Sequence, residues 1–371
     1  MAPLRGLHVD AWTRATDWTM EHARPALVKS LDWGVDWPVQ VARYDTRVLI
    51  LRKWADDDSS LVPSPQAAAE RLWRRFAPDF DRVQASLAQS PVQLYLETPW
   101  NEAHQETPDQ LARHAEACVR FTQLAHAAGW RILVGNFSVC WPKPEHFVAF
   151  APAVAEAEGV SLHEYWMPDR LYPGDWTAHA GPLYDALPAD CPRPPVWITE
   201  CGIDNVDRSR PVNQYGWRSY ARPDAAYVAE LDQFAASQPP VVAGLALFNS
   251  GAIGPRWRTF EVAESAPVAA WLAAGPRDWS PLPPPDPDPQ EPPPMPDETW
   301  DPNPDRLAPV VDGGAILAYA TERRLVYCTP ENFGPGGHSW AVLLDPATDL
   351  AYRVEWTPRT GVRPFEQDRD A

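Results

Sequence analysis

Three glutamates in this sequence occupy places where a carboxylate could do chemistry. Glu200 ends an apolar run that begins at Val196. Glu97 and Glu102 both follow the apolar run that begins at Val92. Two facing carboxylates can cleave a glycosidic bond, because one attacks the anomeric carbon while the other donates a proton to the leaving oxygen. The pattern predicts such chemistry if Glu97 or Glu102 is brought opposite Glu200; the alternative is that these charges only mark strand ends in solvent.

Polar and aromatic residues near the ends of other apolar runs are candidates for binding a substrate. They are Asp10, Arg52, Trp54, Trp100, Asn101, His163, Tyr165, Trp166 and Asn249. The chain has 19 tryptophans, more than packing requires. Indole rings can stack on the apolar faces of sugars, so we expect about a third of them to line a cleft. Arg52 could hold a carboxylate ionised, although an interior salt bridge explains it equally well, and His163 is equally consistent with a core histidine.

Eight apolar runs alternate with helical segments, which predicts an α/β fold of the (β/α)8 TIM barrel type. The expected strands are Gly6–Trp12, Ala26–Trp33, Arg47–Lys53, Val92–Leu96, Arg131–Phe137, Val160–Tyr165, Val196–Glu200 and Val241–Phe248. The expected helices are Ala15–Arg24, Val35–Tyr44, Pro65–Leu87, Pro108–Ala128, Pro144–Glu158, Asp175–Leu187, Asp224–Ser237 and Ala263–Ala274. The carboxyl ends of barrel strands form the catalytic face, which would gather the candidate residues in one place.

A doubly wound sheet would show the same alternation of strands and helices. Such folds often bind nucleotides at a glycine-rich loop, yet this chain has no GxGxxG after its first apolar run and no P-loop. The barrel is therefore the preferred architecture.

Three regions of different composition predict a barrel followed by a second, smaller module. Residues 1–275 would form the barrel, residues 276–308 a proline-rich linker, and residues 309–371 a small β-rich module. Proline locks φ and removes hydrogen-bond donors, so we expect the linker to be extended, or else to be a tail packed on the barrel. Strand-like runs in the last region are Ala315–Ala318, Leu325–Cys328, Ser339–Leu344 and Ala351–Trp356. The last two should pair as a hairpin around Asp345–Asp349.

Charge and composition argue against several classes of partner. A net charge of −18 over 371 residues disfavours nucleic acid. The five cysteines lack CxxC spacing, and the histidines and acids show no ligand spacing, so we expect neither a disulfide framework nor a metal or cofactor. No run reaches the length of a membrane span or a signal peptide. We therefore expect a cytoplasmic protein, or a phage-related one released by lysis.

Three short motifs stand on the fourth, sixth and seventh predicted strands. They are Trp100-Asn101-Glu102, His163-x-Tyr165 and Ile198-Thr199-Glu200-Cys201-Gly202. Their order and spacing across residues 6–274 resemble the clan A (4/7 superfamily) retaining glycoside hydrolases, which carry an Asn-Glu acid/base motif on strand four and often Thr-Glu-x-Gly at the strand-seven nucleophile. The resemblance implies a (β/α)8 barrel that cleaves a polysaccharide or glycoconjugate, and hence a carbohydrate substrate.

The resemblance also assigns roles to single residues. Glu200 would be the nucleophile and Glu102 the acid/base. Asn101 would bind the substrate 2-hydroxyl, and Tyr165 would orient the nucleophile.

The chain departs from the family pattern on strand four. Members often have proline after the acid/base glutamate, whereas here Ala103 follows it. Pro99 lies inside the stretch, and a strand from Val92 to Glu102 would be long for a barrel. Glu97 lies about as deep in its run as the strand-seven glutamate does, so Glu97 is the alternative acid/base.

Two other functions fit the same architecture. A barrel, a proline-rich linker and a small module are typical of phage-type cell-wall lysins, but muramidase barrels of that kind usually carry Asp-x-Glu on strand four, where Tyr95 precedes Glu97 here. The third hypothesis is a barrel that binds glycans without cleaving them, because a fold alone does not determine a function.

Overall fold

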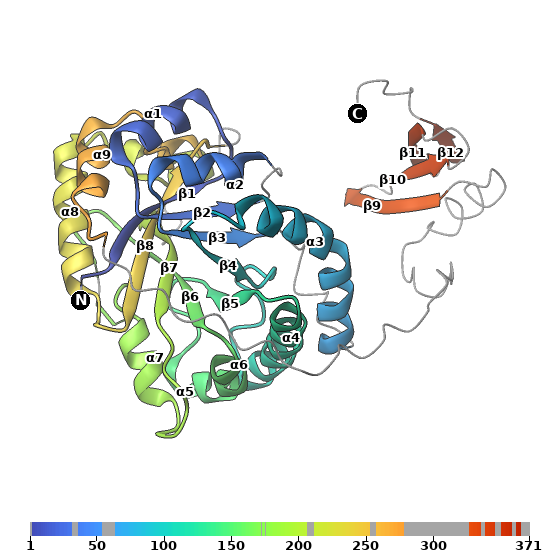
Figure 1. Cartoon of the computed structure of the whole chain (residues 1–371), viewed down its shortest axis with the longest axis horizontal. Coiled ribbons are helices and arrows are strands. Elements are labelled where there is room, and N and C mark those ends of the chain that lie inside the picture. The colour runs from blue at the N-terminus through green and yellow to red at the C-terminus, as the bar shows by residue number, and fades with distance from the viewer. Residues whose placement is uncertain are drawn as a thin grey trace. The chain divides into compact units, whose positions relative to one another are not determined.

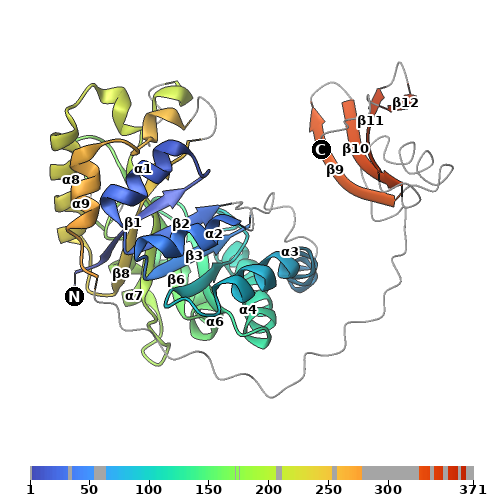
Figure 2. The ribbon, with the colours of Figure 1, turned by 45° about the horizontal axis from the view of Figure 1, so that its top comes forward.

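The first part of the chain folds as a closed barrel of eight parallel strands. The computed structural model describes residues 2–31, 36–53, 64–171, 173–174, 176–205, 211–252, 257–277, 326–334, 338–345, 350–357 and 361–364. Each barrel strand is hydrogen-bonded to the next in sequence, and β8 closes on β1. Figures 1 and 2 show the strands at the centre with helices around them. The predicted TIM barrel is confirmed.

All eight predicted strands are present. They are β1 (Leu4–Val9), β2 (Leu27–Leu31), β3 (Val48–Arg52), β4 (Gln93–Glu97), β5 (Arg131–Phe137), β6 (Gly159–Trp166), β7 (Val196–Ile203) and β8 (Val242–Ser250). Nearly every strand residue is buried, because one face of each strand points into the barrel and the other packs against helices. This is why the strands are visible in the sequence as continuous apolar runs.

The helices that surround the barrel follow the predicted order. They are α1 (Arg14–Ala23), α2 (Asp36–Val41), α3 (Pro65–Leu87), α4 (Pro108–Ala127), α5 (Pro144–Phe147), α6 (Ala151–Glu156), α7 (Ala180–Ala186), α8 (Asp224–Ser237) and α9 (Ala266–Ala273). Short 3₁₀ turns span Ala42–Tyr44, Val148–Phe150, Val212–Gln214, Trp217–Tyr220 and Arg258–Phe260. The two longest helices begin at proline, and Ser64 and Thr107 cap them by accepting hydrogen bonds from backbone N–H groups.

The helix expected at Val35–Tyr44 is α2 followed by the 3₁₀ turn Ala42–Tyr44, and two further helices differ from the prediction. The single helix expected at Pro144–Glu158 is divided by the 3₁₀ turn Val148–Phe150, and Pro152 in the first turn of α6 cannot donate the bond that a continuous helix needs. The helix expected from Asp175 begins only at Ala180, because the backbone before it is held by a carboxylate from β6. Glu164 accepts the N–H groups of Ala178 and His179, each at 2.9 Å.

Successive side chains of each barrel strand point alternately into the barrel and toward the helices. Inside the barrel, an apolar layer of side chains lies below a charged layer. On β2, Leu27 packs inside and Val28 packs against the helices, so Lys29 points inside again. On β4 the same period places Tyr95 and Glu97 inside. The inner apolar cluster consists of Leu4, Ala26, Leu27, Val48, Ile50, Tyr95, Leu133, Trp197 and Ala246. The charged side chains therefore lie above this cluster, toward the carboxyl ends of the strands.

A separate antiparallel sheet follows the barrel. Its strands are β9 (Val326–Gly334), β10 (His338–Asp345), β11 (Leu350–Thr357) and β12 (Gly361–Pro364), in the order β12-β11-β10-β9. Pairing of Asp345 with Leu350 confirms the predicted hairpin. The run Ala315–Ala318 and nearly all of the predicted linker 276–308 lie outside the described residues. The chain divides into two compact units, Met1–Pro293 and Pro294–Ala371, and the predicted domain limits stay a prediction.

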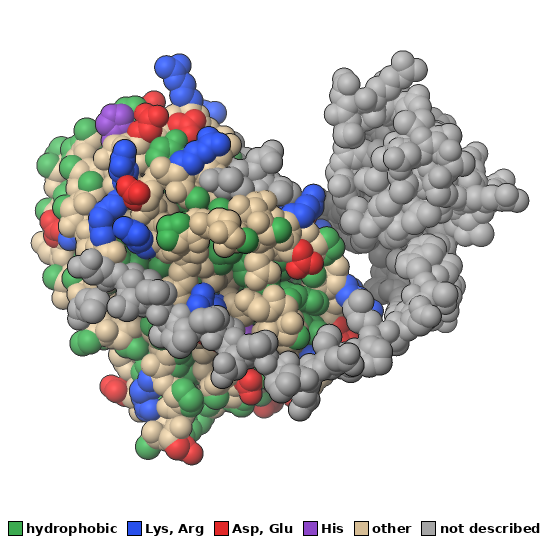
Figure 3. Space-filling view, in the orientation of Figure 1, with side chains coloured by type: hydrophobic (Ala, Val, Ile, Leu, Met, Phe, Trp, Pro, Cys, Tyr) green, Lys and Arg blue, Asp and Glu red, His purple; other side chains and the backbone are tan. Residues whose placement is uncertain are grey.

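The surface of the barrel unit carries a mixture of charged and apolar side chains on the face drawn in Figure 3. Basic and acidic side chains are interspersed on the face drawn in Figure 3. Among large hydrophobic residues in the described ranges, Val148 alone is exposed. None of the helices described is both long and apolar enough to cross a membrane.

Candidate active site

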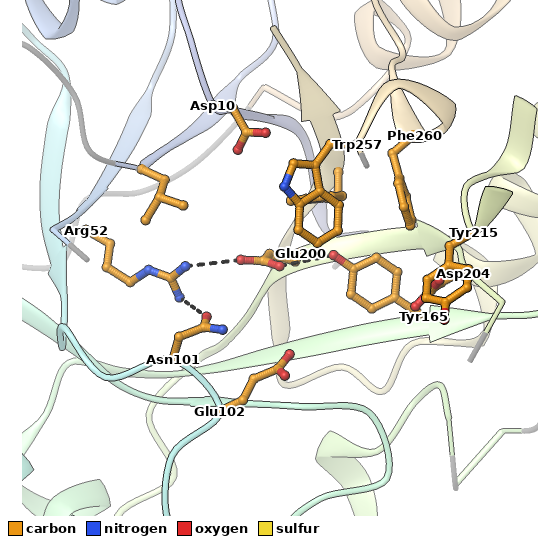
Figure 4. Close-up of a pocket in the computed structure, with 12 residues that line it drawn as sticks. Asp10, Arg52, Asn101, Glu102, Tyr165, Glu200, Asp204, Tyr215, Trp257 and Phe260 are labelled. Carbon is orange, nitrogen blue, oxygen red and sulfur yellow. Dashed lines mark hydrogen bonds and ion pairs between the residues drawn. The ribbon is translucent and has the colours of Figure 1, made fainter. Parts of the chain in front are cut away.

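A cavity of about 440 Å³ lies at the carboxyl ends of the barrel strands. It is lined by Asp10, Leu31, Arg52, Asn101, Glu102, Tyr165, Glu200, Asp204, Tyr215, Phe248, Trp257 and Phe260. The predicted site residues among them are Asp10, Arg52, Asn101, Glu102, Tyr165 and Glu200. Parallel strands bring their carboxyl ends to one mouth of the barrel, which is why residues so distant in sequence meet here. Figure 4 shows Glu200 between Arg52 and Tyr165, with Glu102 reaching into the same cavity.

A β-bulge turns Glu200 into the barrel. Trp197 points inside, so strict alternation along β7 would direct Glu200 toward the surrounding helices. The register between β6 and β7 slips by one residue at Thr199, directly before the glutamate. The extra residue returns Glu200 to the inner face, as bulges next to active sites often do.

Four nitrogen-bearing side chains surround one oxygen of Glu200. Oε1 accepts a hydrogen bond from Lys29 Nζ at 3.0 Å, and Arg52 Nη2 lies 3.4 Å from it. His163 Nε2 lies 3.5 Å from the same oxygen, and His8 Nδ1 lies 3.7 Å from it. These groups come from four different strands, so the position of Oε1 is determined from several sides.

The second oxygen of Glu200 faces a tyrosine. Oε2 accepts a hydrogen bond from the Tyr165 hydroxyl at 3.0 Å. The Tyr165 ring is held edge-on by Phe248 and Phe260, with centroid separations of 6.0 and 6.3 Å. Burial and the neighbouring Glu200 charge raise the pKa of Tyr165 well above its usual value, so the hydroxyl stays a donor. Tyr165 is thus in contact with the glutamate that the sequence predicts it to orient.

The charges around Glu200 keep it ionised. Burial alone would raise the pKa of this carboxyl, but its neighbours His163, Lys29, His8 and Arg52 hold that pKa well below its usual range. An ionised carboxylate next to a cavity has the state that a nucleophile requires.

Glu97, the alternative acid/base, lies below the cavity rather than beside it. Its side chain is fully buried, with Oε2 3.1 Å from Lys29 Nζ and 3.7 Å from Arg52 Nε. Burial opposes ionisation, but these two cations lower the pKa of Glu97 below its usual value. It is not among the cavity residues, so it has neither access to a substrate nor a proton to donate at neutral pH.

Glu102 lies on the loop after β4 and reaches the cavity. Its side chain is 39% exposed, and its Oε1 lies 2.9 Å from His163 Nδ1. Because the other nitrogen of the same ring lies near Glu200, one imidazole spans the gap between the two carboxylates. The His163 ring therefore contacts both carboxylates, with Nδ1 on the side of Glu102 and Nε2 on the side of Glu200.

The loop that carries Glu102 is fastened by Asn136 at the end of β5. Nδ2 of Asn136 donates to the carbonyl oxygens of Thr98 at 2.6 Å and Trp100 at 2.9 Å. Its own carbonyl accepts the N–H of Glu102 at 2.9 Å. Ser161 Oγ donates to Asn136 Oδ1 at 2.5 Å and so fixes the orientation of the amide. Asn136 has a left-handed φ of 52°, which asparagine tolerates better than most residues.

Arg52 and Asn101 are linked to each other as well as to the cavity. Arg52 Nη1 donates to Asn101 Oδ1 at 2.5 Å, while Nη2 of the same guanidinium faces Glu200. The amide oxygen of Asn101 is thereby engaged, so the group that Asn101 can offer to a substrate is its Nδ2 donor. Arg52 thus connects the nucleophile candidate with the residue predicted to bind a hydroxyl.

Asp10 and Asn249 lie together where β1 meets β8. The side-chain amide of Asn249 donates to Asp10 Oδ2, and His8 Nε2 lies 3.4 Å from Asp10 Oδ1. Asp10 lines the cavity, whereas Asn249 is fully buried behind it. Of these two predicted residues, Asp10 can contact a substrate, and Asn249 holds the Asp10 carboxylate by a hydrogen bond.

Two predicted cleft tryptophans belong to the core instead. Trp100 is fully buried and makes an edge contact with Phe121. Trp166 follows the inward-pointing Tyr165, so alternation directs its ring outward to the helices, where it is also fully buried. Neither ring lines the cavity, and neither can stack on a sugar there. Trp54 lies outside the described residues.

Several site residues were not identified from the sequence. They are Lys29, Asp204, Tyr215, Trp257 and Phe260. Lys29 left a usable signal, because a lysine inside a buried strand needs a counter-charge. The others lie on loops after β7 and β8, where no local pattern separates them from ordinary loop residues. Trp257 and Phe260 pack on Phe248, at centroid separations of 5.4 and 5.3 Å, and together form an aromatic wall.

The cavity can support displacement at carbon with acid–base assistance. It places an ionised carboxylate, a more exposed carboxylate and a hydroxyl donor around one space. Within the described part of the chain, no three His, Cys, Asp or Glu side chains are grouped so that they could hold a metal ion.

Proteins similar to this chain are found among solved structures. No family model and no curated protein matches this chain. A solved GH39 enzyme from Xanthomonas axonopodis pv. citri is 12% identical, with a TM-score of 0.48 over 73% of this chain and 67% of that chain. An endo-β-1,4-mannanase double mutant from Cellulomonas fimi is 10% identical, with a TM-score of 0.47 over 74% of this chain and 71% of that chain.

Other matches include proteins of different chemistry. A β-glucanase from Saccharophagus degradans is 15% identical, with a TM-score of 0.44 over 73% of this chain and 86% of that chain. A sugar phosphate isomerase/epimerase from Parabacteroides distasonis is 7% identical, with a TM-score of 0.36 over 74% and 95%. At such identities the likeness concerns the fold alone.

Proposed function

We propose that this chain is a retaining glycoside hydrolase in which Glu200 is the nucleophile and Glu102 the acid/base. The observation that carries the proposal is the pair of carboxylates on either side of the His163 ring. One is surrounded by positive groups and held ionised; the other is more exposed and lines the cavity. The first environment suits a nucleophile, and the second gives Glu102 the access to a leaving group and to water that an acid/base requires.

The first chemical step would form a bond between Glu200 and the sugar. A carboxylate oxygen of Glu200 attacks the anomeric carbon, the glycosidic C–O bond breaks, and the electron pair of that bond goes to the leaving oxygen. Glu102, protonated at this stage, transfers its proton to the same oxygen. Asn101 Nδ2 is placed to donate to a sugar hydroxyl, while Tyr165 keeps the attacking carboxylate in one orientation.

The second step would release the sugar with its original anomeric configuration. Glu102, now ionised, accepts a proton from a water molecule, and the water oxygen attacks the anomeric carbon. The ester bond to Glu200 breaks, and its electron pair returns to the carboxylate. Exposure of Glu102 suits this step, because the residue must meet first a leaving group and then water.

The proposal favours Glu102 over Glu97 for a physical reason. A general acid must carry a proton at the working pH and touch the leaving oxygen. Glu97 is buried against Lys29 and Arg52, and their charges lower its pKa. Glu102 lines the cavity, and Asn101 beside it does so too.

The test is covalent trapping followed by analysis of the products. Aryl 2-deoxy-2-fluoroglycosides of glucose, mannose, xylose and galactose in both anomeric forms should be screened, and the labelled peptide should contain Glu200. NMR of the first product formed from the corresponding substrate should show the starting anomer. Product of the opposite configuration would contradict the retaining mechanism. Binding of oligosaccharides without turnover would favour a glycan-binding barrel, and clearing of peptidoglycan suspensions would identify a cell-wall substrate.

A further inference from the structure

Below Glu200 lies a buried ion pair that the proposed reaction leaves without a role. It consists of Lys29 on β2 and Glu97 on β4, with 3.1 Å between Nζ and Oε2. We propose that this pair positions Glu200 and sets its charge state: Lys29 holds Oε1 and favours the ionised form, while Glu97 offsets part of the lysine charge and keeps the carboxylate reactive. The inference rests on the proposed function of Glu200 as nucleophile.

The ammonium group of Lys29 is surrounded by oxygen atoms of Glu200 and its neighbours. Its Nζ lies 3.0 Å from Glu200 Oε1, 3.1 Å from Glu97 Oε2 and 3.4 Å from Thr199 Oγ1. An ammonium group has three donors, and three oxygens surround this one. Lys29 is not among the residues that line the cavity, so it acts on a substrate only through Glu200. It is a positioning residue rather than a catalytic one.

Burial strengthens the electrostatic interaction of Lys29 and Glu97 with Glu200. The side chains of Lys29 and Glu97 are fully buried, and that of Arg52 is 1% exposed. Charges removed from water interact far more strongly than charges at a surface. With Glu200 included, two cations are shared between two carboxylates in one small volume. Loss of either member of the pair therefore changes the field at Glu200 directly.

The two members of the pair act on Glu200 with opposite signs. A positive charge at Lys29 favours the ionised carboxylate, whereas a negative charge at Glu97 favours the protonated one. A carboxylate that is stabilised too strongly is also a weaker nucleophile. The presence of Glu97 beside Lys29 limits that stabilisation while keeping the lysine in place.

The two oxygens of Glu200 have different neighbours. Oε1 is engaged by Lys29 and Arg52. Oε2 accepts one hydrogen bond, from Tyr165, which itself lines the cavity. An oxygen whose lone pairs face cations attacks carbon poorly. The geometry therefore assigns Oε1 as the anchor and Oε2 as the attacking atom.

Other titratable and charged groups face Glu200 from the surrounding elements. They are His8 on β1, Asp10 after β1, Arg52 on β3, Glu102 after β4, His163 and Tyr165 on β6, and Asp204 after β7. All of them are retained in the variants described next. Differences between those variants therefore report the Lys29–Glu97 pair.

The first experiment replaces Lys29→Met and measures the titration of Glu200. Isotope-edited NMR of labelled glutamate carboxyls follows this titration in the full chain without any turnover, with Glu200→Gln used to assign the signal. We expect the pKa of Glu200 to rise by about one unit or more in K29M. The acid limb of the kcat/KM profile for the best aryl glycoside should move upward by the same amount. Lys29→Arg should restore most of the wild-type value, because it keeps the charge.

The second experiment removes the opposing charge. Glu97→Gln should shift the Glu200 titration to lower pH and reduce kcat/KM about 10-fold, because the carboxylate becomes less nucleophilic. The double variant K29M/E97Q carries a neutral pair of similar shape. The pKa of Glu200 in the double variant should be lower than the pKa of Glu200 in K29M.

Opposite shifts in K29M and E97Q, with the double variant between them, would support the inference. Shifts in the same direction, or no shift in any variant, would overturn it. K29M can fail to fold because Glu97 is left unpaired, and circular dichroism detects this. In that case the effect of Lys29 on the Glu200 titration is measured by comparing E97Q with the double variant. A chain that shows the opposite NMR shifts but hydrolyses no glycoside would retain the electrostatic inference and lose the proposed function.

Discussion

Glu200 and Glu102 lie on opposite sides of the His163 ring, and their surroundings differ in almost every physical respect. Glu200 comes from a barrel strand, its side chain is 10% exposed, and side chains from four other strands surround it. Glu102 comes from a loop, and its side chain is 39% exposed. The position of Glu102 depends on the hydrogen bonds that the side-chain amide and the backbone carbonyl of Asn136 make to the backbone of its loop.

The difference matches what each carboxylate would have to do. A nucleophile keeps one charge state until it attacks, so a rigid, charged environment suits it. An acid/base changes its protonation twice in each turnover and must meet both a leaving group and water. The more exposed position of Glu102, on a loop held by hydrogen bonds to its backbone, permits contact with both a leaving group and water. Each of the following predictions tests one side of this comparison.

The largest effect is expected at Glu200. Glu200→Gln keeps the size of the side chain and removes the charge, so kcat/KM should fall by about 10⁴-fold or more on every substrate. The measurement is steady-state hydrolysis of the best aryl glycoside, with thermal unfolding as a check that the barrel is intact. Activity within about 10-fold of wild type would show that Glu200 is not the nucleophile.

A smaller and substrate-dependent effect is expected at Glu102. Glu102→Gln should reduce kcat about 10²–10⁴-fold on glycosides with poor leaving groups and much less on dinitrophenyl glycosides, which need no proton donor. Azide should restore turnover by attacking the glycosyl ester without base assistance. The matched control is Glu97→Gln, which should not show this leaving-group dependence. If the dependence appears in E97Q instead, the acid/base assignment is wrong.

The backbone support of Glu102 should give an effect of intermediate size. Asn136→Asp keeps the shape of the side chain but removes the two N–H bonds to Thr98 and Trp100. We expect a loss of about 10–100-fold on poor leaving groups, because a misplaced acid donates its proton badly. An equal loss on dinitrophenyl glycosides would indicate general misfolding rather than misplacement of Glu102.

The smallest effect concerns stability at acid pH. The pKa of Glu200 is lower in the folded protein than its usual value of 4.5, so the unfolded chain binds the proton first as pH falls. The free energy of unfolding should therefore rise with pH up to about 4.5 and then level off, as far as Glu200 contributes. Urea unfolding of wild type and E200Q from about pH 3.5 to pH 7 measures this contribution. The same slope in both proteins would show that Glu200 is not held ionised by its neighbours.

Local sequence patterns were sufficient to predict the barrel. Parallel strands covered on both faces are continuous apolar runs, and α3 begins at Pro65, as predicted. The motif around Asn101 and Glu102 placed both residues at the cavity, because the loop after a barrel strand always reaches the same mouth. Periodicity cannot show where alternation fails. The bulge at Thr199 is invisible in the sequence, yet it turns Glu200 inward.

The environment of each residue depended on partners that are distant in sequence. Lys29 and Glu200 are 171 residues apart and meet only because the strands close into a barrel. Trp100 and Trp257 look alike in the sequence, but one packs in the core and the other lines the cavity. No local pattern distinguishes them.

The sequence by itself determined the strand order, the helices between the strands and the mouth at which the candidate residues gather. These follow from hydrophobic periodicity and capping, which act over a few residues. The tertiary structure alone decided which glutamate faces Glu200 across the cavity and which lies buried below it. That choice depends on the charges of Lys29 and Arg52, which come from other strands and lie around Glu97 only after the barrel has closed.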